Sequence, residues 1–251
     1  MAIPTELGTG CPEEPYLVAV FSLLFRYDVR MYAGSLRLQP AAAFAPSSES
    51  RLPAWRLDDL AGRLVELSGT RSTAHLTAAF GLVLEAQLSG DRAAWVTFEH
   101  SAFFPPDAAE GGVDVESLPV VRIATAAAAA RAAEHLVRSG GFGLVVIDLS
   151  SEAGAVAKGR KFEGVPVPML TRLLGLARTH HAAVLILTKK SSDMPSLNSL
   201  ISLRAEAQWT AREGGRGSPG GYDVRVRVLK DKRRAPGWDH VETCRGSAGL
   251  R

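Results

Sequence analysis

Cysteine is scarce in this chain of 251 residues, which contains only Cys11 and Cys244. The two are far apart and form no C-x-x-C pair, so they do not provide the framework of a disulfide-stabilised scaffold. A chain of this length buries roughly 70% of its unfolded-state surface and needs no such crosslinks to fold. We therefore expect a reducing, cytoplasmic compartment.

Apolar runs long enough to cross a membrane are also missing. The segment Tyr16–Phe25 is apolar over about ten residues, half of what a membrane-spanning helix needs. It follows Glu13 and Glu14 rather than the basic residues of a signal peptide, so we expect neither secretion nor membrane association. Such an apolar element must be shielded from water, either by packing on the core of its own chain or by docking onto another subunit, and both alternatives stay open. We interpret residues 1–38 as an oligomerisation or partner-docking element and residues 39–56, rich in Ala, Pro and Ser, as a linker.

A strong excess of one charge is absent from most of the chain, whose net charge is +3 with 46% hydrophobic and 22% charged residues. This balance excludes disordered and fibrous proteins. Residues 212–251 are the exception, because they carry ten Lys or Arg against five Asp or Glu. The basic segment, which ends in a tail over 238–251, suits contact with phosphates; a solvated basic strand is the alternative.

The main domain, predicted over residues 57–237, alternates short apolar runs with helical stretches. This order predicts an α/β fold with a mostly parallel sheet flanked by helices. The run Phe142–Leu149 is the most hydrophobic and is expected to be a central strand. Period-two alternation on both sides of a Gly-rich stretch predicts a C-terminal antiparallel hairpin. The expected strands are 63–68, 93–98, 119–123, 142–149, 183–188, 205–212 and 222–230, and the expected helices are 74–89, 125–139 and 168–181.

A glycine-started loop between the first strand and the first helix is the place for a phosphate-binding loop. In the consensus G-x-x-x-x-G-K-[ST], the last three positions are Gly, Lys and Ser or Thr; this chain has Ala74, His75 and Leu76 there. Alanine adds a Cβ where backbone must curl around phosphate, histidine is shorter than lysine and mostly neutral, and leucine offers Mg²⁺ no oxygen. The free N–H groups of the helix still permit weak anion binding. The degenerate loop comprises Gly69, Thr70, Arg71, Ser72, Thr73, Ala74, His75 and Leu76.

The order of segments from Gly62 to Gly237 resembles the core of the RecA recombinase superfamily. GRLVELSGTRST is similar to its first strand and phosphate loop, and WVTFEHSAFFPPDAAEGGVDVESLPV to the segment with its catalytic glutamate. HLVRSGGFGLVVIDL is similar to its Walker B strand, and DVRVRVLKDKRRAPG to its hairpin with a K-x-K and A-P signature. The degenerate loop and the lead-in WRLDDLAGRLVELSG look most like the ImuA family within that superfamily.

The resemblance implies roles for particular residues. Glu99 matches the water-activating glutamate and Asp148 the Walker B acid, although solvated strand-end carboxylates are the alternative. Lys230 and Lys232 match the lysines that contact ATP across a subunit interface. Together with Arg233 and Arg234 they are candidates for interface or phosphate contacts, and an exposed hairpin end is the alternative. Candidates for two altered DNA-binding loops are Lys158, Arg160, Lys161, Lys189 and Lys190. No metal-binding cluster is expected.

The resemblance further implies a function in damage-induced translesion DNA synthesis in a bacterial cytoplasm. We expect a scaffold without catalytic activity and without a required cofactor, which binds an ImuB-like Y-family protein and through it an error-prone C-family polymerase. RecA, the DNA backbone and a second copy of the chain are further expected partners. One alternative is a DNA-dependent ATPase that keeps ATP and Mg²⁺ and uses Arg71 in place of the loop lysine; another is a SulA-like inhibitor of cell division.

Overall fold

The computed structural model describes residues 54–70, 74–99, 101, 103, 105–150, 164–211 and 221–245. These residues all belong to Arg51–Arg251, the second of the two units into which the chain divides. The N-terminal element 1–38 and most of the linker 39–56 lie outside the described residues, so their predicted roles stay predictions.

The predicted strands and helices of the main domain are confirmed, with ends that agree within two residues. Strands Ala93–Phe98 and Ala183–Thr188 have the predicted bounds. Two short helices, α2 and α4, were not predicted. The elements are α2 (Leu57–Leu60), β1 (Leu64–Ser68), α3 (His75–Leu88), β2 (Ala93–Phe98), α4 (Pro105–Glu110), β3 (Val120–Ile123), α5 (Ala126–Arg138), β4 (Leu144–Asp148), α7 (Val167–His180), β5 (Ala183–Thr188), β6 (Leu203–Ala211), β7 (Gly221–Asp231) and β8 (Asp239–Arg245).

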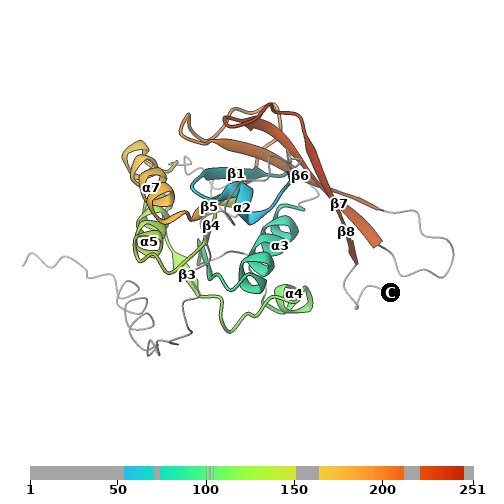
Figure 1. Ribbon diagram of the computed structural model, residues 1–251, viewed down its shortest axis with the longest axis horizontal. Coiled ribbons are helices and arrows are strands. Elements are labelled where there is room, and N and C mark those ends of the chain that lie inside the picture. The colour runs from blue at the N-terminus through green and yellow to red at the C-terminus, as the bar shows by residue number, and fades with distance from the viewer. Residues whose placement is uncertain are drawn as a thin grey trace, which may run out of the picture. The chain divides into compact units, whose positions relative to one another are not determined.

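The strands form one eight-stranded sheet in the order β3-β2-β4-β5-β1-β6-β7-β8 (Figure 1). The pairs from β3 through to β6 are parallel. The pairs β6–β7 and β7–β8 are antiparallel. Strand β4 lies inside the parallel part with all five residues buried, as its lack of polar alternation predicts. The predicted α/β fold class is therefore confirmed.

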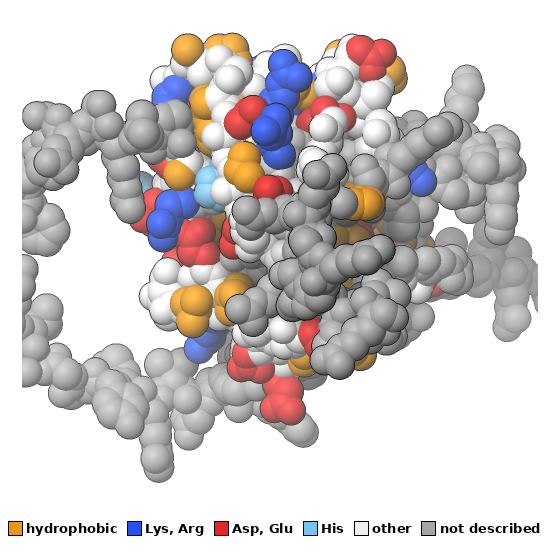
Figure 2. Space-filling model, turned by 90° about the vertical axis from the view of Figure 1, so that its right-hand side faces the viewer, with side chains coloured by type: hydrophobic (Ala, Val, Ile, Leu, Met, Phe, Trp, Pro, Cys, Tyr) orange, Lys and Arg blue, Asp and Glu red, His pale blue; other side chains and the backbone are white. Residues whose placement is uncertain are grey.

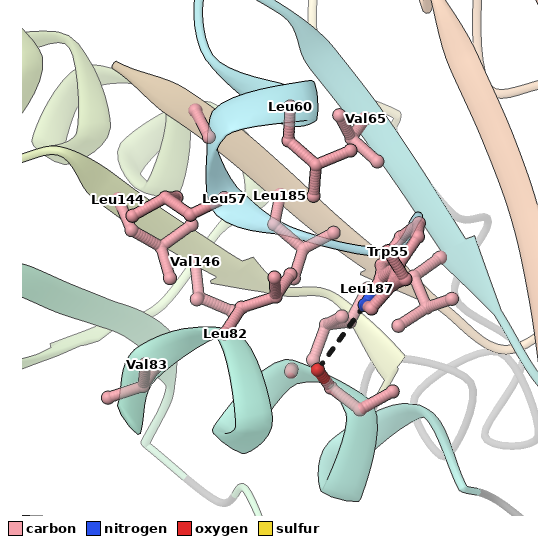
Figure 3. Packing of buried hydrophobic residues seen from close by; sticks show 14 of the residues in the cluster. Trp55, Leu57, Leu60, Val65, Leu82, Val83, Leu144, Val146, Leu185 and Leu187 are labelled. Atoms are coloured by element: carbon pink, nitrogen blue, oxygen red, sulfur yellow. Dashed lines mark hydrogen bonds between the residues drawn. The ribbon is translucent and has the colours of Figure 1, made fainter. Parts of the chain in front are cut away.

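Helices cover both faces of the parallel part of the sheet. Val65 and Leu67 of β1 belong to the same buried cluster as Leu82 and Val83 of α3, so odd-numbered β1 residues face α3 (Figure 3). Helices α5 and α7 lie beside each other on the other face (Figure 1). Helix α5 begins at an N-cap, Thr125, whose side-chain oxygen accepts a hydrogen bond of 3.1 Å from the N–H of Ala128.

The core extends beyond both ends of the predicted main domain. Trp55, placed in the linker by sequence, is 6% exposed, and its Nε1 donates to the carbonyl of Ala78 at 3.5 Å (Figure 3). At the other end, residues 239–245 of the predicted tail form β8 instead. Strand β8 is hard to recognise from sequence because its seven residues, DHVETCR, are mostly polar. Polar and charged residues are typical of strands at the edge of a sheet. No helix in the described part of the chain is long and apolar enough to cross a membrane.

Two tryptophans test this account of the core, one buried and one exposed as a control. Trp95 is fully buried and stacks on Phe80 with ring centroids 4.7 Å apart. Trp95→Ala leaves a cavity and should lower the free energy of unfolding by about 3–5 kcal/mol. Trp209 is 47% exposed, so Trp209→Ala should cost about 1 kcal/mol or less. Urea unfolding measures both, and equal costs would contradict this account of the core.

Candidate functional site

The carboxyl ends of the central parallel strands meet at one edge of the sheet. Ser68 at the end of β1 pairs with Thr188 of β5, and Asp148 at the end of β4 pairs with Thr97 of β2. In open α/β sheets this edge is where ligands bind. The first residues of α3, which follow β1, lie at the same edge, so the predicted loop and the predicted Walker B acid are brought together.

His75 begins α3 at the position of the consensus lysine, and its imidazole is turned into the protein. The residue is 3% exposed, and its Nδ1 lies 3.1 Å from the point where a side chain on Gly69 would begin. Neither ring nitrogen has a hydrogen-bond partner among the described residues. Burial lowers the pKa of His75 below its ordinary value, nearby Asp148 opposes this shift, and Lys189 adds to it. A neutral imidazole therefore lies against the start of the loop.

The neighbours of His75 do not fit a magnesium nucleotide. Leu76 packs against the hydrophobic cluster and has no oxygen with which to bind a metal ion. Ala74 is 2% exposed and precedes α3 in a helical conformation with φ −72°. Arg71, Ser72 and Thr73 lie outside the described residues, and Thr70 is exposed. The chemistry of the described loop residues thus supports anion contact at most, through the N–H groups of the helix.

Asp148 is held by hydroxyl groups of the chain itself. Its Oδ1 accepts from the N–H of Ser150 at 3.0 Å and from the Ser150 hydroxyl at 2.6 Å. Its Oδ2 accepts from the hydroxyls of Ser101 at 3.2 Å and Thr97 at 3.4 Å. The residue is 3% exposed. Four internal donors therefore hold the carboxylate that the resemblance assigns to orienting magnesium.

Glu99 follows β2 directly and is exposed. Its main chain is tied to β3, because its N–H donates to the carbonyl of Ile123 at 3.2 Å and its carbonyl accepts from Arg122 at 3.3 Å. The position at the end of β2 agrees with the resemblance, and the exposure agrees equally with the alternative of a solvated strand-end carboxylate.

A buried ion pair at the same edge was not found by sequence reasoning. Glu66 in β1 is fully buried and forms a salt bridge of 2.5 Å with Lys190, which follows β5. The Glu66 carboxylate also accepts from the Thr188 hydroxyl at 2.9 Å and from the N–H of Leu197 at 2.8 Å. The Nζ of Lys190 donates in addition to the carbonyl of Pro195 at 2.7 Å. Lys190, a DNA-loop candidate, therefore compensates a buried charge.

The hairpin cations contact backbone and side-chain groups of the chain itself. Lys232 donates through Nζ to the carbonyl of Ser199 at 2.5 Å, and Lys230 lies 3.5 Å from the Ser196 hydroxyl. Burial, with Lys232 and Arg204 adding and Glu66 opposing, lowers the pKa of Lys230 below its ordinary value. Arg233 and Arg234 are exposed and contact the segment around α2, at the Ala61 carbonyl (3.3 Å) and the Asp59 carboxylate (3.0 Å).

Of the DNA-loop candidates, Lys189 is exposed at the end of β5. Lys158, Arg160 and Lys161 lie outside the described residues, so their predicted role stays a prediction. Among the residues that the structure describes, no group of three or more His, Cys, Asp or Glu is arranged to hold a metal ion.

Comparisons with known proteins agree with this geometry. Residues 59–164 match the RecA N-terminal domain family. The RecA protein of Clostridium acetobutylicum is 40% identical over 87 residues, which are 35% of this chain and 25% of that protein. RecA of Trichodesmium erythraeum is 41% identical over 87 residues, 35% of this chain and 24% of its own. RecA of a Picosynechococcus species is 35% identical over 120 residues, 46% of this chain and 33% of its own.

The chain thus spans a quarter to a third of the length of these curated relatives. The matches support a RecA-superfamily protein, so the predicted resemblance is confirmed at that level. The segment that matches the RecA N-terminal domain family includes β1, the degenerate loop, Glu99 and Asp148, whereas β5 to β8 and their cations follow it in the chain.

Because His75 is buried, we expect the stability of the protein to depend on pH. Between the pKa of an unfolded histidine, about 6.5, and the lower folded pKa of His75, the unfolded chain binds a proton that the folded chain does not. The free energy of unfolding should therefore fall as the pH is lowered below about 6.5, by up to about 1.4 kcal/mol per pH unit from this group. His75→Leu should flatten the decline, because it removes the histidine whose pKa is lowered and leaves the other histidines unchanged. Urea unfolding from pH 7.5 to 5 tests this, and an unchanged slope in the variant would refute it.

The Glu66–Lys190 pair predicts a non-additive effect on stability. Lys190→Met leaves a buried carboxylate without its cation and should cost about 3 kcal/mol. The double variant Glu66→Gln/Lys190→Met should recover more than half of that loss, because no buried charge remains. Lys189→Met is the matched control, since the loss of this exposed cation should change stability by about 0.5 kcal/mol or less. Chemical denaturation of the wild type and the three variants measures these changes in the free energy of unfolding. Equal losses of stability in Lys189→Met and Lys190→Met would contradict the role of Lys190 as the partner of Glu66.

Proposed function

We propose that this RecA-like chain is an accessory protein of damage-induced translesion DNA synthesis, similar to the ImuA family, that binds partner proteins and does not hydrolyse ATP. The observation that carries the proposal is His75. Its neutral imidazole lies buried against Gly69, where a hydrolysing loop places a lysine on the phosphates.

Two further features support a loss of hydrolysis. Leu76 supplies no metal-binding oxygen, and the Asp148 carboxylate accepts hydrogen bonds from Thr97, Ser101 and Ser150. An ATPase must stabilise the charge that develops on the transferred phosphoryl group, which requires cations and Mg²⁺ in place. The RecA-like sequence and sheet support a DNA-repair or recombination-type setting, because the matched relatives are RecA proteins.

The proposed partners follow from the resemblance to the ImuA family. They are an ImuB-like Y-family protein, and through it an error-prone C-family polymerase, with RecA as a further candidate. Exposed Lys189, Arg233 and Arg234 support weak contact with the DNA backbone, which added salt should weaken in proportion to the phosphates neutralised. We place this function in the cytoplasm, associated with the nucleoid during DNA damage.

Phosphate release from ATP and Mg²⁺, with and without single-stranded DNA, tests the loss of hydrolysis. We expect a rate at the background of the buffer and no change in Glu99→Gln, because the loop lacks its lysine and its metal-binding hydroxyl. Capture of a purified ImuB-like protein at micromolar concentration tests the scaffold, and binding should be equal with and without ATP. A DNA-stimulated rate that disappears in Glu99→Gln would refute the proposal in favour of an ATPase, and failure to capture the partner would refute the scaffold.

A further inference from the structure

Strand β8 has one edge whose backbone groups point away from the rest of the sheet. Among the described residues β8 pairs on one side only, with β7. The N–H of Val228 donates to the carbonyl of Trp238 at 3.0 Å, and the register continues through Val226 opposite His240. Because hydrogen-bonded pairs alternate along an antiparallel ladder, the even-numbered residues of β8 bond to β7, and the odd-numbered Val241 directs its N–H and C=O outward.

This edge carries an exposed apolar residue between two charged or titratable ones. Val241 is 50% exposed and stands between His240 and Glu242. The strand contains neither proline nor lysine, which commonly block pairing at sheet edges. Figure 2, which views the molecule from the right-hand side of Figure 1, shows hydrophobic, acidic and basic side chains intermixed with histidine on this side.

A groove with a volume of about 490 Å³ runs beside β8 and is bounded by α3 and the segment before α2. His240, Val241 and Glu242 form one wall, and Leu84 and Leu88 of α3 contribute to the other. Leu88 is 79% exposed. A strand added to β8 would therefore lie beside this groove, whose lining also includes Arg56, Glu85 and Ser89. Side chains alternate along a strand, so His240 and Glu242 face α3 and the exposed side chain of Val241 lies on the opposite face of the sheet.

The residues of β8 are complementary to a second copy of themselves. A two-fold axis perpendicular to the sheet makes two β8 strands antiparallel, and the residue on the axis fixes the register. With Val241 on the axis, His240 of each copy lies opposite Glu242 of the other, so no like charges face each other. With Glu242 on the axis, two carboxylates would face each other, which is destabilising.

We propose that the chain forms a two-fold dimer through β8, with Val241 on the axis and two reciprocal His240–Glu242 pairs. The two sheets then continue into one another through main-chain hydrogen bonds between the outward groups of the paired strands. This interface is built by the C-terminal strands alone. Its residues belong neither to the N-terminal element nor to the degenerate loop on which the proposed function rests.

Sedimentation of the full chain at up to about 100 μM tests the dimer, because a strand-sized interface is expected to have micromolar affinity. Val241→Pro removes an outward N–H from each copy but none that bonds to β7, so the monomer should keep its fold. We expect wild-type protein to dimerise and Val241→Pro to dimerise at least about tenfold more weakly. A monomeric wild type, or a folded variant that dimerises as the wild type does, would overturn the proposal.

A charge exchange tests the register and does not depend on the proline variant. His240→Glu places a second carboxylate opposite Glu242 at both pairs of the interface and should weaken the dimer about tenfold or more. The exchanged variant His240→Glu/Glu242→His restores both opposite pairs and should return to within about threefold of the wild type. Circular dichroism confirms that each variant is folded. A double variant as weak as His240→Glu alone would show that these residues do not face each other.

Discussion

A buried carboxylate in the middle of a parallel strand constrains the segment that follows β5. Glu66 is fully buried, and ionised Glu66 needs both a cation and hydrogen-bond donors within reach. Lys190 supplies the cation, while Thr188 and the N–H of Leu197 supply donors. Because Leu197 lies seven residues beyond Lys190, the segment that follows β5 is drawn back across the end of β1.

Other cations also hold the segment that follows β5 in place. Arg204 is 4% exposed and donates to the carbonyls of Ser191 and Met194, and Lys232 donates to Ser199. Arg63 at the start of β1 pairs with Asp231, so the end of β7 is also joined to the central strand. The pKa of Asp231 is lowered, because burial, which raises it, is outweighed by the N–H of Arg233 and by Arg63. Lys232, which sequence alone relates to phosphates, thus joins Arg63 and Arg204 in holding the chain together.

Sequence predicted the fold well where burial on both faces leaves a plain hydrophobic run, as in Ala93–Phe98 and Ala183–Thr188. It failed at β8, where an edge strand needs little hydrophobicity and gives a weak pattern. It located His75 but not the direction of its side chain, because the turn toward Gly69 depends on tertiary packing. The partner of Lys190 was also missed, since Glu66 is 124 residues away and its charge lies in an otherwise apolar strand.

The two halves of the sheet therefore have different capacities for binding. In the parallel half, the buried carboxylates of Glu66 and Asp148 and the ammonium group of Lys190 have their partners within the chain. In the antiparallel half, β7 and β8 extend beyond the helices (Figure 1), and the outer edge of β8 keeps backbone groups directed away from the sheet. The antiparallel half therefore has an edge with which a further strand could pair through main-chain hydrogen bonds.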